Sequence, residues 1–201
     1  MKHLILFLLS AICLFSSCSE PETMDSDIAL SVVSACIADI DSTRYKPLEI
    51  DWHDDNGSNR LFMVCFRLIA TNDSCYECVY YRSYGSPKPE IKPTYIIPSE
   101  RRTFARTRRI PFDSLRPLIL ANIEKMKRQI PEGNRFKSVG SCSVDLSPKN
   151  TLRHSITLSL GGRGSHTRQV SRRQFKTDYR QMYGLMDEGG ELRISIADLK
   201  K

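Results

Sequence analysis

The chain has 201 residues, of which 40% are hydrophobic and 26% charged, and its formal net charge is +7 at pH 7. Its length suits one domain or two small ones, and the absence of repeats and of low-complexity tracts excludes a solenoid. The charge is uneven, because residues 18–56 carry ten acids and two bases, whereas residues 57–201 carry 13 acids and 27 bases.

The first seventeen residues have the layout of an export signal. Lys2 is the only formal charge before Cys18, and an apolar run of about twelve residues extends from Leu4 to Phe15. A helix that crosses a bilayer needs about 20 apolar residues, so a permanent transmembrane helix is not expected here. Residues 1–17 are therefore predicted to be a signal peptide.

The end of this run, Leu14-Phe15-Ser16-Ser17-Cys18, resembles the lipobox of bacterial lipoproteins. The resemblance implies that Cys18 receives a diacylglyceryl group, that the chain is cut just before it, and that the new amine is acylated. Phe15 departs from the commoner Leu, and Cys13 is a rival acceptor preceded by the bulky Ile12. An ordinary cleaved signal and an uncleaved anchor remain as alternatives.

The next four residues, Ser19-Glu20-Pro21-Glu22, add an expected address. A serine after the lipidated cysteine resembles an outer-membrane sorting choice, and acids at this place are similar to the surface-export signals of Bacteroidota lipoproteins. The expected localisation is the outer membrane, lipid-anchored on its periplasmic face or at the cell surface. Residues 18–25 are expected to be the lipidated cysteine and a tether, and residues 26–201 a single domain. The acidic part then lies nearest the membrane, which argues against electrostatic docking onto anionic head groups.

Hydrophobic spacing predicts the first elements of the domain. Residues 25–41 place apolar side chains four apart behind Asp25 or Ser26 as a cap, which predicts an amphipathic helix. A polar loop is expected next, with an Asn-Gly turn, since its spacing of acids does not match an EF-hand. Residues 60–70 are continuously apolar and typical of a central strand, and residues 75–84 are predicted to pair with it.

The middle of the chain is predicted to contain a loop, a strand and a helix. Residues 85–98 hold four prolines and are expected to form a loop or a short edge. Residues 102–110 are interpreted as a strand rich in arginine. Residues 112–130 repeat apolar side chains at helical spacing, with Asp113 as a cap and a proline and a glycine after the end.

The clearest β signal is a hairpin of residues 136–146 and 151–160, where apolar and polar side chains alternate. Leu146 and Leu152 share the buried face only if a five-residue loop or a bulge joins the strands. This face is expected to bury the following side chains: Phe136, Val144, Leu146, Leu152, Ile156, Leu158 and Leu160.

The last part of the chain completes the predicted fold. Residues 175–186 have helical spacing and are interpreted as a third helix, and residues 192–196 as a final strand. The elements predict the α+β class, with a mostly antiparallel sheet of about five to six strands and two to three helices packed on one face.

Five cysteines remain after Cys18, and an odd number at irregular spacing does not indicate a disulfide framework. Cys75 and Cys78 form a CxxC motif, which is a possible disulfide. In a strand, however, their Cα atoms would lie about 10 Å apart, beyond bridging distance. A turn would restore the disulfide or a redox pair, and no second Cys or His motif supports a zinc site.

Two groups of arginines are candidates for anion binding. Arg102, Arg106 and Arg108 would share one face of the expected strand, and Arg163 and Arg168 lie in or near the Gly-rich loop 161–165. Because an exported protein rarely meets nucleic acid, a polyanionic glycan, lipopolysaccharide phosphate or an acidic partner protein is the better ligand if these groups bind one, and nucleic acid is not expected. The alternatives are a solvated edge strand whose charges prevent aggregation and a solvated basic turn.

No catalytic constellation is found in the sequence. It has no GxSxG, no HExxH and no persuasive pair of carboxylates, and His154 is expected to pack in the core. The sequence therefore favours a non-catalytic, lipid-anchored interaction module of the cell envelope, with no cofactor, no metal and an unidentified envelope partner. The alternatives are an envelope thiol-redox or hydrolytic enzyme and a polyanion binder.

Overall fold

The computed structural model describes residues 23–82, 89–95, 102–162, 165–171, 174–187 and 190–197. Within these ranges the helices are α2 (Asp27–Asp39) and α3 (Phe112–Lys127), and neither is long and apolar enough to span a bilayer. The strands are β1 (Tyr45–Asp54), β2 (Leu61–Ala70), β3 (Cys75–Tyr81), β4 (Lys92–Pro93), β5 (Asn134–Leu146), β6 (Leu152–Gly162), β7 (His166–Ser171), β8 (Gln174–Asp178), β9 (Arg180–Met186) and β10 (Leu192–Ala197).

Eight strands form one antiparallel sheet in the order β10-β9-β6-β5-β1-β2-β3-β4, and β7 and β8 form a separate ribbon. The first half of the chain consists of α2 followed by β1 to β4, and the second half of α3 followed by β5 to β10. In each half the first strand lies at the centre of the sheet and the later strands of the sheet lie successively nearer its edge. The first strands of the two halves, β1 and β5, pair in the middle, where Ile50 lies opposite Val144. The α+β class with a large antiparallel sheet is confirmed, but the sheet has eight strands where five to six were predicted.

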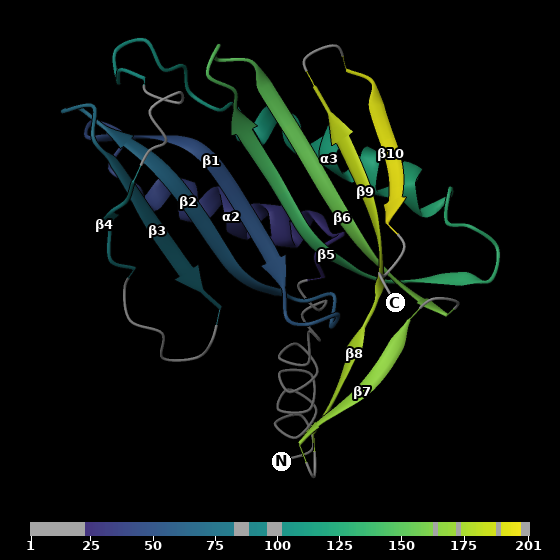
Figure 1. Cartoon of the computed structure of the whole chain (residues 1–201). Coiled ribbons are helices and arrows are strands. Elements are labelled where there is room, and N and C mark those ends of the chain that lie inside the picture. The colour runs from purple at the N-terminus through teal and green to yellow at the C-terminus, as the bar shows by residue number, and fades with distance from the viewer. Residues whose placement is uncertain are drawn as a thin grey trace, which may run out of the picture.

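Both helices lie on one face of the sheet, α2 behind the strands of the first half and α3 behind those of the second (Figure 1). The core fills the space between the helices and the sheet. At its centre, Trp52 of β1 is fully buried, and its ring meets that of Phe112 of α3 edge to face at 5.5 Å. The opposite face of the sheet is covered by neither helix, and we call it the open face.

Ser26 is the cap of α2, as one of the two predicted alternatives had it. Its side chain accepts a hydrogen bond from the Ala29 N–H at 3.2 Å, which satisfies one of the free donors of the first turn. The domain begins before this cap, because Thr23 forms a β-bridge with Arg60 and Met24 is fully buried. The three residues from Thr23 onwards therefore belong to the domain, and the expected tether is shorter by that much.

The central strand β1 lies where a polar loop was expected. Ile50 and Trp52 are buried against the helices, while Glu49, Asp51 and His53 alternate with them on the open face. This two-residue period is the signal of a half-buried strand. The acidic residues of the segment concealed it, since they favoured the interpretation as a loop.

The hairpin of β5 and β6 is confirmed, including its register. Leu146 lies directly opposite Leu152, and five residues join them. Val144, Leu146, Ile156, Leu158 and Leu160 are buried, and Phe136 and Leu152 are partly buried against the same core.

Residues 102–110 do not form the predicted strand but a turning segment at one end of the sheet, which we call the arginine loop (Figure 1). Its Phe104 packs on a small apolar cluster apart from the main core, made by Leu48, Ile69 and Cys75. The Phe104 N–H donates to the carboxylate of Asp73 at 2.6 Å. A side-chain acceptor and this cluster thus replace the neighbouring strand that a β-strand would need.

The third helix predicted over residues 175–186 is wrong, because this segment forms β8 and β9. In β9, Met182 and Met186 are buried, and Tyr183 and Leu185 between them are exposed. Apolar residues on both faces hid the two-residue period and produced an apparent helical spacing.

Candidate functional site

The centre of the open face carries charges that are paired with one another. Asp51 and His53 of β1 are joined by a hydrogen bond of 2.7 Å between Oδ2 and Nε2. Ion pairs between neighbouring strands flank them: Arg67 with Glu49 at 2.8 Å, and Arg153 with Asp145. The carboxylates of these pairs are therefore largely neutralised by basic neighbours.

The hydrogen bond that His53 donates to Asp51 raises the pKa of His53 above its ordinary value, because it stabilises the imidazolium form. His53 thus contributes stability that is fully present below about pH 6.5 and is lost as the pH rises through its raised pKa. The sequence interpretation missed this pair, since it placed both residues in a loop. The alternation around Ile50 and Trp52 would have revealed it.

Four of the five described thiols, those of Cys36, Cys65, Cys78 and Cys142, are not activated for nucleophilic chemistry. Cys65 lies opposite Asp51 on the next strand, and burial, with a contribution from that carboxylate, raises the pKa of its thiol to about 11. Burial also raises the pKa of Cys36 to about 11, and those of Cys78 and Cys142 above the ordinary value. Since the thiolate is the reactive form, these thiols react slowly near neutral pH.

The CxxC motif lies within β3, as the strand interpretation predicted. Cys75 contacts Leu48 and Ile69 of the small apolar cluster, whereas Cys78 belongs to the main core under the helices. The two side chains therefore point to opposite faces of the sheet, and no disulfide joins them. The possible disulfide between Cys75 and Cys78 is not formed in this structure.

The arginine loop brings one of the two candidate anion-binding groups together. Lys46 ties the loop to β1 by donating to the carbonyls of Phe104 at 2.7 Å and Thr107 at 2.8 Å. Arg102 donates to the Leu146 carbonyl at 2.5 Å and is partly buried, so it holds the loop in place. The exposed basic side chains at this end of the sheet are Arg44, Arg106, Arg108, Arg109 and Lys149.

The second candidate group does not join the first. Arg168 lies on β7, in the ribbon that extends beyond the opposite end of the sheet, and its guanidinium pairs with Asp178 at 3.1 Å (Figure 1). Arg163 lies outside the described residues. Arg102, Arg106 and Arg108 therefore lie on one loop, where Arg106 and Arg108 are exposed and Arg102 is partly buried, and Arg168 belongs to a different part of the molecule.

The acidic loop after β1 is a turn, as the Asn-Gly motif predicted. The Asp54 carboxylate accepts hydrogen bonds from the N–H groups of Gly57 at 2.8 Å and Asn59 at 3.3 Å. Gly57 has a φ of +83°, and a Cβ on it would lie 2.8 Å from the Tyr179 ring, so both conformation and space favour glycine. In the part of the chain that the structure describes, no group of three or more His, Cys, Asp or Glu residues is arranged to hold a metal ion.

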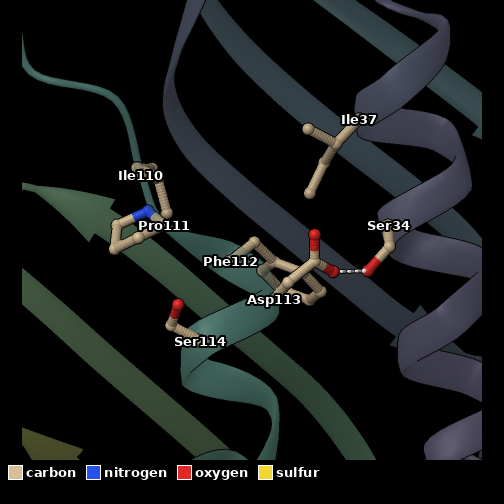
Figure 2. Close-up of a pocket in the computed structure, with 7 residues that line it drawn as sticks. All are labelled: Ser34, Ile37, Ile110, Pro111, Phe112, Asp113 and Ser114. Carbon is tan, nitrogen blue, oxygen red and sulfur yellow. Dashed lines mark hydrogen bonds between the residues drawn. The ribbon is translucent and has the colours of Figure 1, made fainter.

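A small pocket of about 240 Å³ lies between α2 and the start of α3 (Figure 2). Ser34 of α2 donates a hydrogen bond of 2.6 Å to Asp113 of α3 across it. The lining residues are Ser34, Ile37, Ile110, Pro111, Phe112, Asp113 and Ser114. The acid and the hydroxyl satisfy each other and Asp113 is largely exposed, so the pocket stabilises the contact between the helices and offers no set of groups for catalysis.

His154 is a core histidine, as predicted, with 2% of its surface exposed.

Comparison with protein-family models, with curated proteins and with solved structures finds no match to this chain. The candidate surfaces therefore rest on geometry alone: the open face with its paired charges, and the arginine loop at one end of the sheet.

Proposed function

We propose that the protein is a lipid-anchored, non-catalytic binding module of the outer membrane, with Cys18 as the acylated residue. The observation that carries the proposal is the place where the chain enters the domain. Thr23, five residues after Cys18, is bridged to Arg60, so a membrane anchor at Cys18 would hold this end of the sheet close to the bilayer.

The entry point is fixed by several contacts. The Met24 N–H donates to the Asn59 carbonyl at 2.9 Å, and the Asn59 side chain donates to Asp25 at 2.8 Å. Lys127 of α3 binds the other oxygen of Asp25 at 2.6 Å. An anchored chain would therefore hold the domain in a restricted orientation.

The arginine loop lies towards the far end of the sheet from this entry point. Asn59 accepts a hydrogen bond from the Val139 N–H of β5, whereas Arg102 binds the same strand at Leu146. Seven residues of strand separate these contacts, which is about 23 Å. An anchor at Cys18 would thus turn the arginine loop away from the bilayer, towards soluble or surface-bound partners.

The test of the anchor is the variant Cys18→Ala, with Cys13→Ala in the same leader as the matched control. We expect Cys18→Ala to release the protein from the membrane fraction or to leave an uncleaved precursor, and Cys13→Ala to behave as wild type. Mass spectrometry of the mature N-terminus should find an acylated cysteine at residue 18. An unmodified chain that begins elsewhere and still fractionates with membranes would contradict the proposal.

The arginine loop favours a second candidate function, the binding of a polyanion such as a sulfated or phosphorylated glycan. Arg106 and Arg108 are exposed on it beside further bases. We expect the domain to bind heparin-agarose and to elute at lower salt after Arg106→Glu with Arg108→Glu, because charge neutralisation drives such binding. The control, Lys125→Glu on α3 with Arg128→Glu just after its end, changes the net charge equally. Equal elution of both double variants would show that the loop is not the binding site.

The enzyme alternative has a separate test. The raised pKa values of the thiols of Cys36, Cys65, Cys78 and Cys142 give no support to a thiol enzyme. Alkylation rates measured against pH should show no thiolate below about pH 8.5. A cysteine that reacts with a pKa well below this value would favour the enzyme over the binding module.

A further inference from the structure

The two edges of the sheet differ in how they are protected. At one edge β4 has only two residues, and one of them is Pro93, which lacks an N–H. At the other edge β10 has six residues, pairs with β9 in an unbroken register and contains no proline. Among the described residues, no strand pairs with the outer side of β10. As far as the described part of the chain goes, this edge is therefore free to pair with another strand.

The helix side of β10 presents an unfinished apolar layer. Ile194 lies opposite Gly184 and Ile196 opposite Met182, so both isoleucines point towards α3. Both pack against the main core but remain partly exposed. Apolar side chains on an added strand would extend this layer beyond the edge, and their burial would be favourable.

The open side of the same edge carries exposed apolar side chains. Tyr183 and Leu185 of β9 are 41% and 51% exposed, and they lie opposite Ser195 and Arg193 of β10. The small Ser195 leaves the tyrosine ring uncovered. A large side chain on an added strand could therefore extend over Ser195 towards this ring.

We propose that β10 receives an extended segment of a partner protein as a ninth, antiparallel strand. The segment carries aliphatic residues opposite Ile194 and Ile196, a large apolar residue opposite Ser195, and a carboxylate opposite Arg193. The Arg193 guanidinium is 73% exposed and its nearest acid, Asp187, is 3.9 Å away, so it is accessible to a second carboxylate. This inference rests on the proposed function as a binding module and names its partner class. The pairing itself needs no acylation of Cys18, which enters only the choice between a partner segment and a second copy of the chain.

A second copy of the chain fits this edge less well than a partner segment. Two copies that join their β10 strands antiparallel are related by a twofold axis perpendicular to the sheet, so their entry ends point in opposite directions. The five residues from Cys18 to Glu22 span about 17 Å at most. The thirteen residues of β5 alone are about 43 Å long. Two copies anchored to one membrane would not both reach it.

The test uses a chain that begins at Ser19, since the described core lies between Met24 and Leu192. The probe is a fluorescent peptide, acetyl-Thr-Val-Tyr-Val-Glu-Val-amide, whose glutamate comes opposite Arg193 in the proposed register. We expect saturable binding with a Kd below about 1 mM. Amide resonances of β10 should shift in the NMR spectrum. A peptide with proline in place of the first two valines should not bind, because it lacks two N–H donors.

A charge exchange separates this site from nonspecific binding. Arg193→Glu should weaken binding about three- to tenfold. A second peptide, with arginine in place of glutamate, should bind this variant better than it binds the wild type. Lys125→Glu on α3 has the same charge change and should leave the preference for the glutamate peptide unaltered.

Three results would overturn the inference: no saturable binding, resonance shifts away from β10 and β9, or a response to Arg193→Glu that is the same for both peptides. If the peptide does not bind but Cys18 is found acylated, the proposal of strand addition at β10 is contradicted and the proposed lipid anchor is not. If the peptide binds but Cys18 is found unmodified, the lipid anchor is contradicted and strand addition at β10 is not.

Discussion

His154 lies in β6 between Val144 and Met186 of the neighbouring strands, with neither ring nitrogen hydrogen-bonded. Burial lowers the pKa of His154 to about 4, because the charged ring would lose its hydration without gaining a partner. In the unfolded chain, His154 is exposed and takes up a proton near pH 6.5. Stability is therefore unaffected by this residue above pH 6.5 and is lost as the pH falls from there towards 4.

We expect His154 to make the domain about 2 kcal/mol less stable at pH 5 than at pH 7.5. His154→Leu should remove this loss, since leucine binds no proton. Urea unfolding at the two pH values, followed by the fluorescence of Trp52, measures the difference. The control variant, His53→Gln, removes the charge pair that His53 forms with Asp51 at low pH. Its loss of stability between pH 7.5 and pH 5 should therefore be larger than that of the wild type, not smaller. A loss of stability at pH 5 that His154→Leu leaves unchanged would contradict this assignment.

At the scale of elements, the contact between α3 and β9 depends on the absence of a side chain at Gly184. A Cβ at this position would lie 2.5 Å from the Met126 sulfur and 3.1 Å from Leu192. The glycine therefore lets the fully buried Met126 of α3 approach the backbone of the sheet.

Gly184→Ala should destabilise the domain by about 1–3 kcal/mol through overpacking. Met126→Ala should cost about 2–5 kcal/mol by leaving a cavity. In the double variant the alanine methyl partly fills that cavity, so the combined loss should be smaller than the sum of the two. Urea unfolding of the four proteins measures this coupling. Strictly additive losses would mean that the two positions do not compete for the same space.

The elements that could be predicted from the sequence are those in which the spacing of apolar residues reflects burial in the core alone. In β6 the apolar residues from Ile156 to Leu160 face the core. In α2 the helical spacing predicted the element, although Ile28 of the predicted stripe is exposed and Ala29, Leu30 and Val33 are buried. In β9, by contrast, Tyr183 and Leu185 are apolar yet exposed. The spacing of apolar residues in this strand therefore does not show which of them are buried.

The candidate surfaces were less predictable, because they depend on contacts between distant segments. Phe104 packs in a cluster contributed by three strands, which no local pattern in residues 102–110 indicates. The acidic segment around Asp51 is typical of a loop, and only its pairing with β5 shows that it is a strand. The edge at β10 likewise follows from the order of the strands and not from its own sequence.

At the scale of the whole molecule, each half of the chain exposes the first strand of its sheet until the other half pairs with it. The fragment 23–95 would contain β1 as an edge, with Ile50 and Trp52 lacking the contacts made by β5 and by Phe112. Neither half on its own completes the core.

We expect fragment 23–95 to be unfolded alone, with Trp52 emitting as a solvated indole. Because Trp52 is the only tryptophan of the chain and is fully buried, its emission should shift to shorter wavelength when fragment 102–197 is added. Fluorescence and circular dichroism of each fragment and of the mixture measure this. A native-like emission from fragment 23–95 alone would show that the first half folds independently.

The pairing of β1 with β5 also bears on the order in which the chain reaches its native state. Ile50 and Val144 meet across 94 residues, so the central ladder belongs to the slowest class of contacts to form. Because synthesis begins at the N-terminus, β1 is available long before β5 follows it. Contact order thus delays folding until most of the chain is present, and the first half keeps its unpaired strand edge exposed until then.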